Sequence, residues 1–173
     1  MADNGQKSPT GRKHDGFQPG FLRVEQAPGG TVGGLLVTNR LGRPLEFQCT
    51  TPVRPNRTQE ILYGPTLESF VFSELIGKTL HDRLNCPPDV IFVNQLALME
   101  LRSLLDLPVL GLGAIAKGSK NVLGGRSILL HTDFPGDSEL VRVWERTLPP
   151  AVDLEEPLQR IHEALNETLR SVA

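Results

Sequence analysis

Aromatic and cysteine residues are scarce in this chain. Only 5% of its 173 residues are aromatic, with one Trp and one Tyr, so there are few rings on which unpaired nucleic-acid bases could stack. Its two cysteines, Cys49 and Cys86, form no C-x-x-C motif and no zinc-ligand spacing with a histidine. We therefore expect no disulfide framework, no metal site, no cofactor and a reducing, cytoplasmic location.

A strong charge and long apolar runs are missing as well. The formal net charge is −2 and the pI is about 6.1, whereas a protein that wraps nucleic acid carries a basic face and a high pI. No apolar stretch approaches the roughly 18 to 20 residues of a membrane span, and residues 1–20 contain no signal-peptide core. The sequence thus indicates a soluble protein without a nucleic-acid or membrane partner.

The remaining composition is that of an ordinary globular protein. Hydrophobic residues make up 39% of the chain and charged residues 22%, and the length fits one domain. Residues 1–20 are rich in Gly, Pro, Ser and charged side chains, which is typical of a flexible tail. We expect this tail to precede a single domain over residues 21–173.

The N-terminal half of that domain has the pattern of β-strands. Short apolar segments over residues 21–26, 31–38 and 45–51 are separated by Gly-rich turns, and they predict a three-stranded antiparallel meander. Gly33 and Gly34, inside the second strand, indicate a bulge or a close backbone approach. Residues 52–65 contain three prolines, which oppose regular structure.

Helical periodicity follows. Apolar residues recur at spacings of three and four over residues 66–84, where Thr66 is the expected N-cap, and again over residues 153–172. A shorter helix is predicted over residues 95–105. Residues 137–148 fit either a hairpin strand or an amphipathic helix, and we favour the helix.

The second half of the chain also contains strands. Residues 89–93 and 108–112 flank the helix at 95–105, so the three segments predict a βαβ crossover with parallel strands. A further strand is expected over residues 127–132. The sequence therefore predicts a mixed α/β (or α+β) fold whose sheet of about five or six strands is antiparallel at its N-terminal end and parallel in its central βαβ unit.

A Gly-rich basic loop over residues 111–126 is the most suggestive segment for function. It contains no Asp or Glu, and backbone amides beside unopposed cations can hold a phosphate-type anion. Its order of residues is not that of a Walker A motif. An ordinary surface loop is the alternative to an anion site. The candidate ligand-binding residues are Lys117, Gly118, Ser119, Lys120 and Arg126.

His131 and Asp133 form a second candidate. Both lie at the end of a predicted strand, where alternation places them on one side, and Asn94 follows another predicted strand. Ligands of open α/β sheets bind beyond the carboxyl ends of the strands, so these residues could share a crevice and His131 could act as a general base. An ordinary strand end is the alternative.

Cys49 is a third candidate. It precedes two arginines, Arg54 and Arg57, and a cationic setting lowers the pKa of a thiol and activates it as a nucleophile. The alternative is a small buried side chain next to a solvated loop.

No catalytic constellation is complete in the sequence. We therefore predict a soluble, non-catalytic binding or adaptor domain whose partner is a protein or a small anionic ligand. The alternative is a small enzyme or ligand-binding protein that holds a phosphate-type anion in loop 111–126. Whether the chain is an enzyme stays open at this point.

Overall fold

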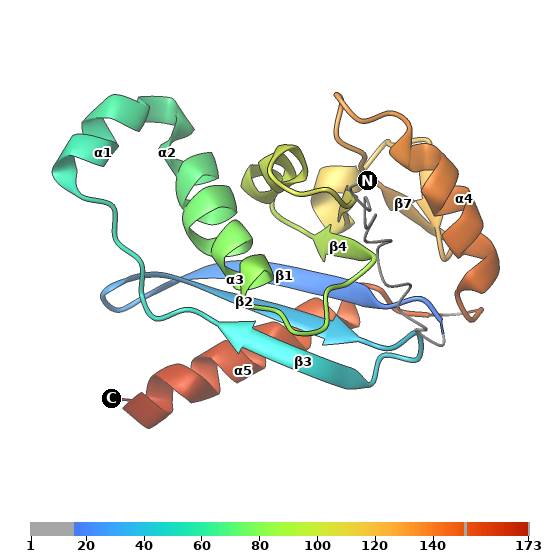
Figure 1. Cartoon of the computed structure of the whole chain (residues 1–173), viewed down its shortest axis with the longest axis horizontal. Coiled ribbons are helices and arrows are strands. Elements are labelled where there is room, and N and C mark those ends of the chain that lie inside the picture. Colours follow the sequence, from blue (N-terminus) through green and yellow to red (C-terminus); the bar gives the residue numbers. More distant parts are fainter. Residues whose placement is uncertain (1–15, 151, 173) are drawn as a thin grey trace, which may run out of the picture.

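The computed structural model describes residues 16–150 and 152–172, which form a mixed α/β structure. A five-stranded sheet carries helices on both faces, and a small two-stranded sheet lies beside it (Figure 1). The predicted fold class is confirmed. Most of the predicted tail, residues 1–15, lies outside the described residues. Phe17 is buried, with its ring centroid 5.3 Å from that of Trp144, and the first strand begins at Pro19.

The five-stranded sheet has the order β3-β2-β1-β4-β5. Strands β1 (Pro19–Ala27), β2 (Gly30–Thr38) and β3 (Pro44–Cys49) form the predicted antiparallel meander. Strands β4 (Val90–Val93) and β5 (Val109–Gly111) run parallel to β1. The carboxyl ends of these three parallel strands therefore meet at one edge of the sheet.

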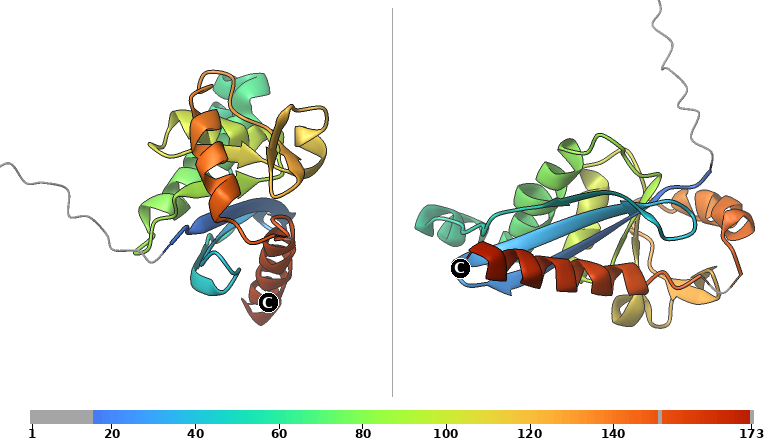
Figure 2. Two further views of the ribbon diagram at one scale, coloured as in Figure 1. Left: turned by 90° about the vertical axis from the view of Figure 1, so that its right-hand side faces the viewer. Right: turned by 90° about the horizontal axis from the view of Figure 1, so that it is seen from below.

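Helices cover both faces of the sheet because β2, β4 and β5 are buried on both sides along almost their whole length. Helix α5 (Glu156–Val172) lies across one face (Figure 2). The opposite face is covered by a helical run from Leu67 to Asp82 and by the 3-10 helix η3 (Leu96–Ser103). That run consists of α2 (Leu67–Ser69), the π-helix η2 (Phe70–Lys78) and α3 (Thr79–Asp82). Along the described part of the chain, no helix combines the length and apolar character needed to cross a membrane.

Gly33 and Gly34 explain how both helical layers come close to β2. A Cβ on Gly33 would collide with Ile76 of η2, and one on Gly34 would lie 2.7 Å from Cγ2 of Ile161 in α5. The predicted close backbone approach is therefore confirmed, and it occurs on both faces of the sheet.

Two helix predictions need correction. Residues 52–65 are not wholly irregular, because α1 (Arg57–Tyr63) forms there behind a capping box in which the Asn56 side chain accepts from the Gln59 amide. The prolines of this segment all fall outside the helix. Thr66 does not cap the next helix, since its hydroxyl donates to the Tyr63 carbonyl oxygen at 2.6 Å.

The segment after β5 also differs from the prediction. The strand expected at 127–132 is shorter, and β7 (Arg126–Ile128) pairs with β6 (Asn121–Leu123) in the separate two-stranded sheet. Within residues 16–150 and 152–172, its one β-bridge to the main sheet is the isolated bridge between Leu129 and Gly111. The favoured helix at 137–148 is confirmed as α4 (Asp137–Thr147).

Glu46 ties the edge strand β3 to the turn before β4. Its carboxylate accepts hydrogen bonds from the backbone amides of Asn85 at 3.0 Å and Cys86 at 2.8 Å, and from the Gln48 amide group at 3.0 Å. Burial raises the pKa of Glu46, but the hydrogen bonds from Gln48, Asn85 and Cys86 outweigh it, so the pKa lies below its ordinary value.

Glu46→Gln should lower the free energy of unfolding at neutral pH by about 1 kcal/mol, the scale of a net hydrogen-bond contribution. Because the pKa of Glu46 is lower in the folded state, its stabilisation is present above the unfolded pKa and is lost as the pH falls through the folded pKa. Denaturant melts from pH 7 to pH 3 should show the two proteins converging. Glu167→Gln, at an exposed side chain, is the control; a pH-independent gap for Glu46→Gln would contradict the prediction.

Candidate functional site

A hollow of about 500 Å³ opens at the carboxyl end of β4, beside the middle of β1. Arg23 of β1 and Asn94 after β4 line it, together with Gly113 after β5 and Gln159 of α5. We call it the strand-end hollow. The chain leaves β1 toward β2 on one side and leaves β4 toward β5 on the other, so the hollow lies at the point where strand order reverses. Such points are where open α/β sheets bind ligands.

Asn94 is held in this hollow by its neighbour. The Gln95 side chain accepts from the Val24 backbone amide at 2.9 Å and donates to the Val24 carbonyl oxygen at 2.8 Å, so it continues the ladder past the end of β4. Oδ1 of Asn94 is buried without a hydrogen-bond partner among the described residues. A buried acceptor of this kind is costly, which marks Asn94 as a group that a ligand or water can satisfy.

Arg23 belongs to a chain of polar contacts between β1 and α5. Its Nε lies 2.6 Å from Oε1 of Glu25, which is 2.5 Å from Nδ1 of His162. Nε2 of His162 lies 3.1 Å from the Asn166 amide nitrogen. Arg23 and Glu25 were not among the predicted site residues, although two polar residues at i and i+2 in an apolar strand indicate a polar site on one face.

The carboxylates around the strand-end hollow are paired with arginines. Arg126 lies 3.4 Å from Asp153 and 3.3 Å from Glu155, and Arg160 lies 3.0 Å from Glu156. Asp153 also accepts hydrogen bonds from the backbone amides of Glu155, just before α5, and Glu156, its first residue. These contacts offset the negative charge beside the hollow.

Loop 111–126 borders the same hollow through Gly113 and Ala114. Lys117 and Lys120 are exposed, and their side chains form no hydrogen bond or ion pair with any residue in the described ranges. Gly118 between them has a φ of +84°, and a Cβ there would meet nothing within 4 Å. Ser119 accepts from the Asn121 amide at 3.3 Å.

The roles of the five predicted residues therefore differ. Arg126 is held by acids, whereas Lys117 and Lys120 remain as unopposed cations at the carboxyl end of β5.

His131 and Asp133 do not form the arrangement expected from a strand. They follow β7 in a turn, where the Asp133 backbone amide donates to Nδ1 of His131 at 3.1 Å. Nε2 of His131 faces Glu100 of η3 at 3.8 Å, and Phe134 packs on the ring edge. Asn94 lines the strand-end hollow, but His131 and Asp133 are not among its lining residues.

Cys49 is a free, partly buried thiol at the end of β3. It lines a mostly apolar hollow of about 400 Å³ together with Pro52 and Leu169. Arg57 pairs with Glu60 at 3.1 Å. The structure thus places Cys49 beside apolar groups.

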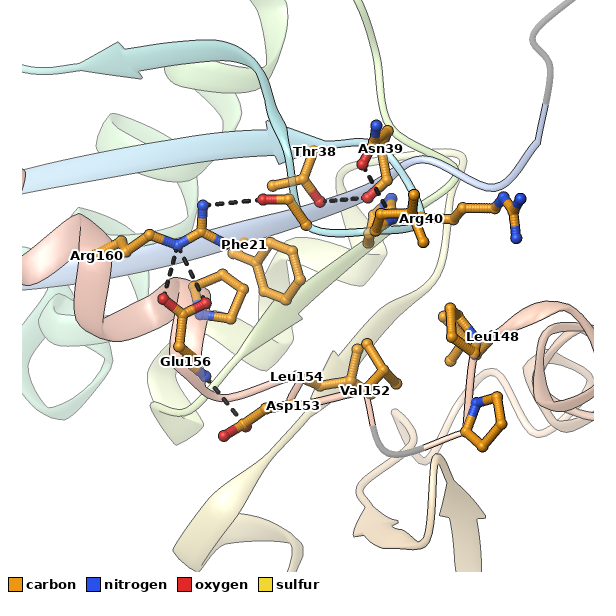
Figure 3. Close-up of a pocket in the computed structure, with 16 residues that line it drawn as sticks. Phe21, Thr38, Asn39, Arg40, Leu148, Val152, Asp153, Leu154, Glu156 and Arg160 are labelled. Carbon is orange, nitrogen blue, oxygen red and sulfur yellow. Dashed lines mark hydrogen bonds and ion pairs between the residues drawn. The ribbon is translucent and has the colours of Figure 1, made fainter.

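A larger hollow of about 520 Å³ lies between the turn after β2 and the start of α5 (Figure 3). Figure 3 shows Arg160 bonded to Glu156, while its guanidinium also donates to the Gly42 carbonyl oxygen at 2.9 Å. The wall around Phe21 and Leu154 is apolar, and both residues are almost wholly buried. Two cations line this hollow: Arg160 is paired with Glu156, whereas Arg40 is exposed and makes no ion pair with the described residues.

Comparison with known proteins gives structural neighbours only. No family model and no curated protein sequence matches the chain. The structure of endonuclease V from Streptomyces avermitilis matches with a TM-score of 0.56 and 14% sequence identity, over 91% of this chain and 83% of that one. The chain has the same kind of fold as endonuclease V.

A looser neighbour is endonuclease V from Ciona intestinalis. It was solved in complex with a 23mer DNA that contains an inosine followed by a ribo-adenosine. Its TM-score is 0.45 at 10% identity, over 90% of this chain and 86% of that one.

The likeness to endonuclease V corrects two predictions about function. We expected a non-catalytic binding or adaptor domain, and we expected no nucleic-acid partner. Both are wrong, because the fold is shared with an enzyme named for acting on nucleic acid. The alternative that we left open, a small enzyme or ligand-binding protein for a phosphate-type anion, agrees better with this finding. The net charge of the chain was a poor criterion for nucleic-acid binding, because it sums over the whole surface and does not show where unpaired cations lie.

Proposed function

We propose that the chain binds nucleic acid through phosphate contacts at the carboxyl ends of its parallel strands. The observation that carries the proposal is the pair of unopposed lysines, Lys117 and Lys120, in loop 111–126, whose Gly113 and Ala114 border the strand-end hollow. The fold shared with endonuclease V supports it. The proposed contacts come from loop 111–126, with Lys117, Gly118, Ser119 and Lys120 facing phosphate oxygens.

The local electrostatics fit this assignment. Phosphate contacts supply most of the affinity of nucleic-acid binding, and lysine and backbone amides are their usual donors. Gly118 leaves the backbone open to a close approach. Arg126 offsets part of the negative charge of Asp153 and Glu155, which repels a phosphate. Arg23 and Asn94 then offer donors inside the hollow itself.

A metal-dependent hydrolytic centre does not fit the residues present. Two-metal nucleases clamp the attacking and leaving oxygens between ions, and these hard cations prefer oxygen ligands such as carboxylates. Across residues 16–150 and 152–172, no three His, Cys, Asp or Glu side chains form a group that could hold a metal ion. The acids at the strand-end hollow are committed to Arg126 and Arg160.

Lys117→Gln/Lys120→Gln should weaken binding of fluorescent DNA and RNA oligonucleotides and flatten the salt dependence. On duplex DNA each phosphate contact contributes a slope of about −0.9 in log K against log salt, so losing two contacts should reduce the slope by about 2. Fluorescence anisotropy between 50 and 200 mM salt measures both effects for single and double strands. A denaturing gel of the same samples with Mg²⁺ shows whether the bound strand is also cut.

The matched control is Arg83→Gln/Arg170→Gln, which removes two exposed cations away from loop 111–126. This variant should keep the wild-type slope. No binding by the wild-type protein at micromolar concentration in low salt, or equal losses in the two double variants, would refute the proposal.

We also propose that the protein works in a reducing compartment. Cys49 and Cys86 are both free thiols, which supports work in a reducing compartment such as the cytoplasm.

A further inference from the structure

A separate hollow of about 360 Å³ lies beside the helical run on the face opposite α5. Tyr63 and Phe70 line it, with stacked rings whose centroids are 3.8 Å apart. Glu74 and Glu100 line it as well. We call this cavity, with Tyr63, Phe70, Glu74 and Glu100 in its lining, the aromatic hollow.

The two carboxylates of the aromatic hollow lack a cationic partner of their own. Glu74 is exposed and makes no hydrogen bond or ion pair with the described residues, and Glu100 has only Nε2 of His131 at 3.8 Å. Among the residues that the structure describes, no Lys or Arg lines the hollow. Aromatic rings beside unopposed carboxylates attract an organic cation and disfavour a phosphate.

Elsewhere in this protein an aromatic ring and a carboxylate bind an arginine side chain. The Arg102 guanidinium lies 3.8 Å from the centroid of the Phe134 ring, and its Nε lies 2.9 Å from Oδ2 of Asp137. An aromatic ring and a carboxylate thus hold one arginine inside the molecule. The aromatic hollow has the same receptor chemistry without the arginine.

We propose that the aromatic hollow binds an arginine side chain of a protein partner. Arginine suits it better than lysine, because a guanidinium is planar, weakly hydrated and stacks on rings. Helix α1, which carries Tyr63, has no buried residue, and its Ile61 and Leu62 are 64% and 77% exposed. Helix α1 lies at the far end of the molecule from α4 (Figure 1). Its exposed apolar side chains offer a surface to the rest of such a partner. This site is independent of the proposed nucleic-acid contacts.

Tyr63 is the only tyrosine, so its ring signals in an NMR spectrum report on the hollow directly. We would titrate the full chain with N-acetyl-arginine amide, its uncharged analogue N-acetyl-citrulline amide, spermidine, and the peptide acetyl-Leu-Arg-Leu-amide. The arginine compound should shift the Tyr63 signals saturably, and citrulline should bind about tenfold more weakly, since it loses the cation–π and carboxylate contacts. The peptide should bind several-fold more tightly than the single residue.

Glu74→Gln/Glu100→Gln should weaken arginine binding about tenfold, whereas Glu68→Gln/Glu167→Gln, at two other exposed acids, should leave it unchanged. Folding of each variant is checked by its remaining NMR spectrum. Equal shifts by citrulline, tighter binding of spermidine, no advantage of the peptide, or saturable shifts by an oligonucleotide would each overturn the proposal.

Discussion

Arg102→Ala should lower the free energy of unfolding by about 3–5 kcal/mol, the usual effect of stranding one partner of a buried ion pair. Arg102 and Asp137 have side-chain exposures of 13% and 7%, and their bidentate contact has distances of 2.9 and 3.2 Å. The guanidinium also donates to the Leu105 carbonyl oxygen at 3.0 Å. This arginine therefore connects the end of η3, the turn at Phe134 and the start of α4.

A double-mutant cycle separates the pair from its surroundings. Asp137→Ala and Arg102→Ala/Asp137→Ala complete the cycle, and chemical denaturation gives each free energy of unfolding. The double variant should lose less than the sum of the single losses, because neither charge is then left unpaired. Additive losses, or a loss below about 0.5 kcal/mol for Arg102→Ala, would show that the pair behaves like a surface ion pair.

Ile76→Ala should cost about 2–5 kcal/mol, the range for a large-to-small substitution in a packed core. Ile76 is fully buried in η2 and fits against Gly33 of β2. The glycine leaves no side chain that could move into the space, so the cavity should persist. Denaturant melts with an unchanged m-value and a lower midpoint would report the loss.

Ile61→Ala is the matched control for this substitution. It removes the same atoms from a side chain that is 64% exposed in α1, so its effect should stay within about 0.5 kcal/mol. Similar losses at the two positions would mean that Ile76 does not have the packing described above.

The site was less predictable than the fold. Loop 111–126 was visible because it has no acids of its own, yet the acids that hold Arg126 come from residues 153–155, far along the chain. Which of its three cations stay unpaired could be read only from the folded chain. His131 and Asp133 do not lie on one side of a strand as predicted, because β7 ends at Ile128 and strand alternation reaches neither residue.

The sequence by itself determined the antiparallel meander, the parallel β4–β5 pair and the C-terminal helix α5, because apolar periodicity and turn residues act over a few neighbouring positions. Only the tertiary structure decided that Arg23 and Asn94 share a hollow, that β7 leaves the main sheet, and that Tyr63 and Phe70 face Glu74 and Glu100. These juxtapositions join segments that come from different elements and lie far apart in the sequence. No local pattern encodes such packing, since it is fixed by the fit of side chains across the core.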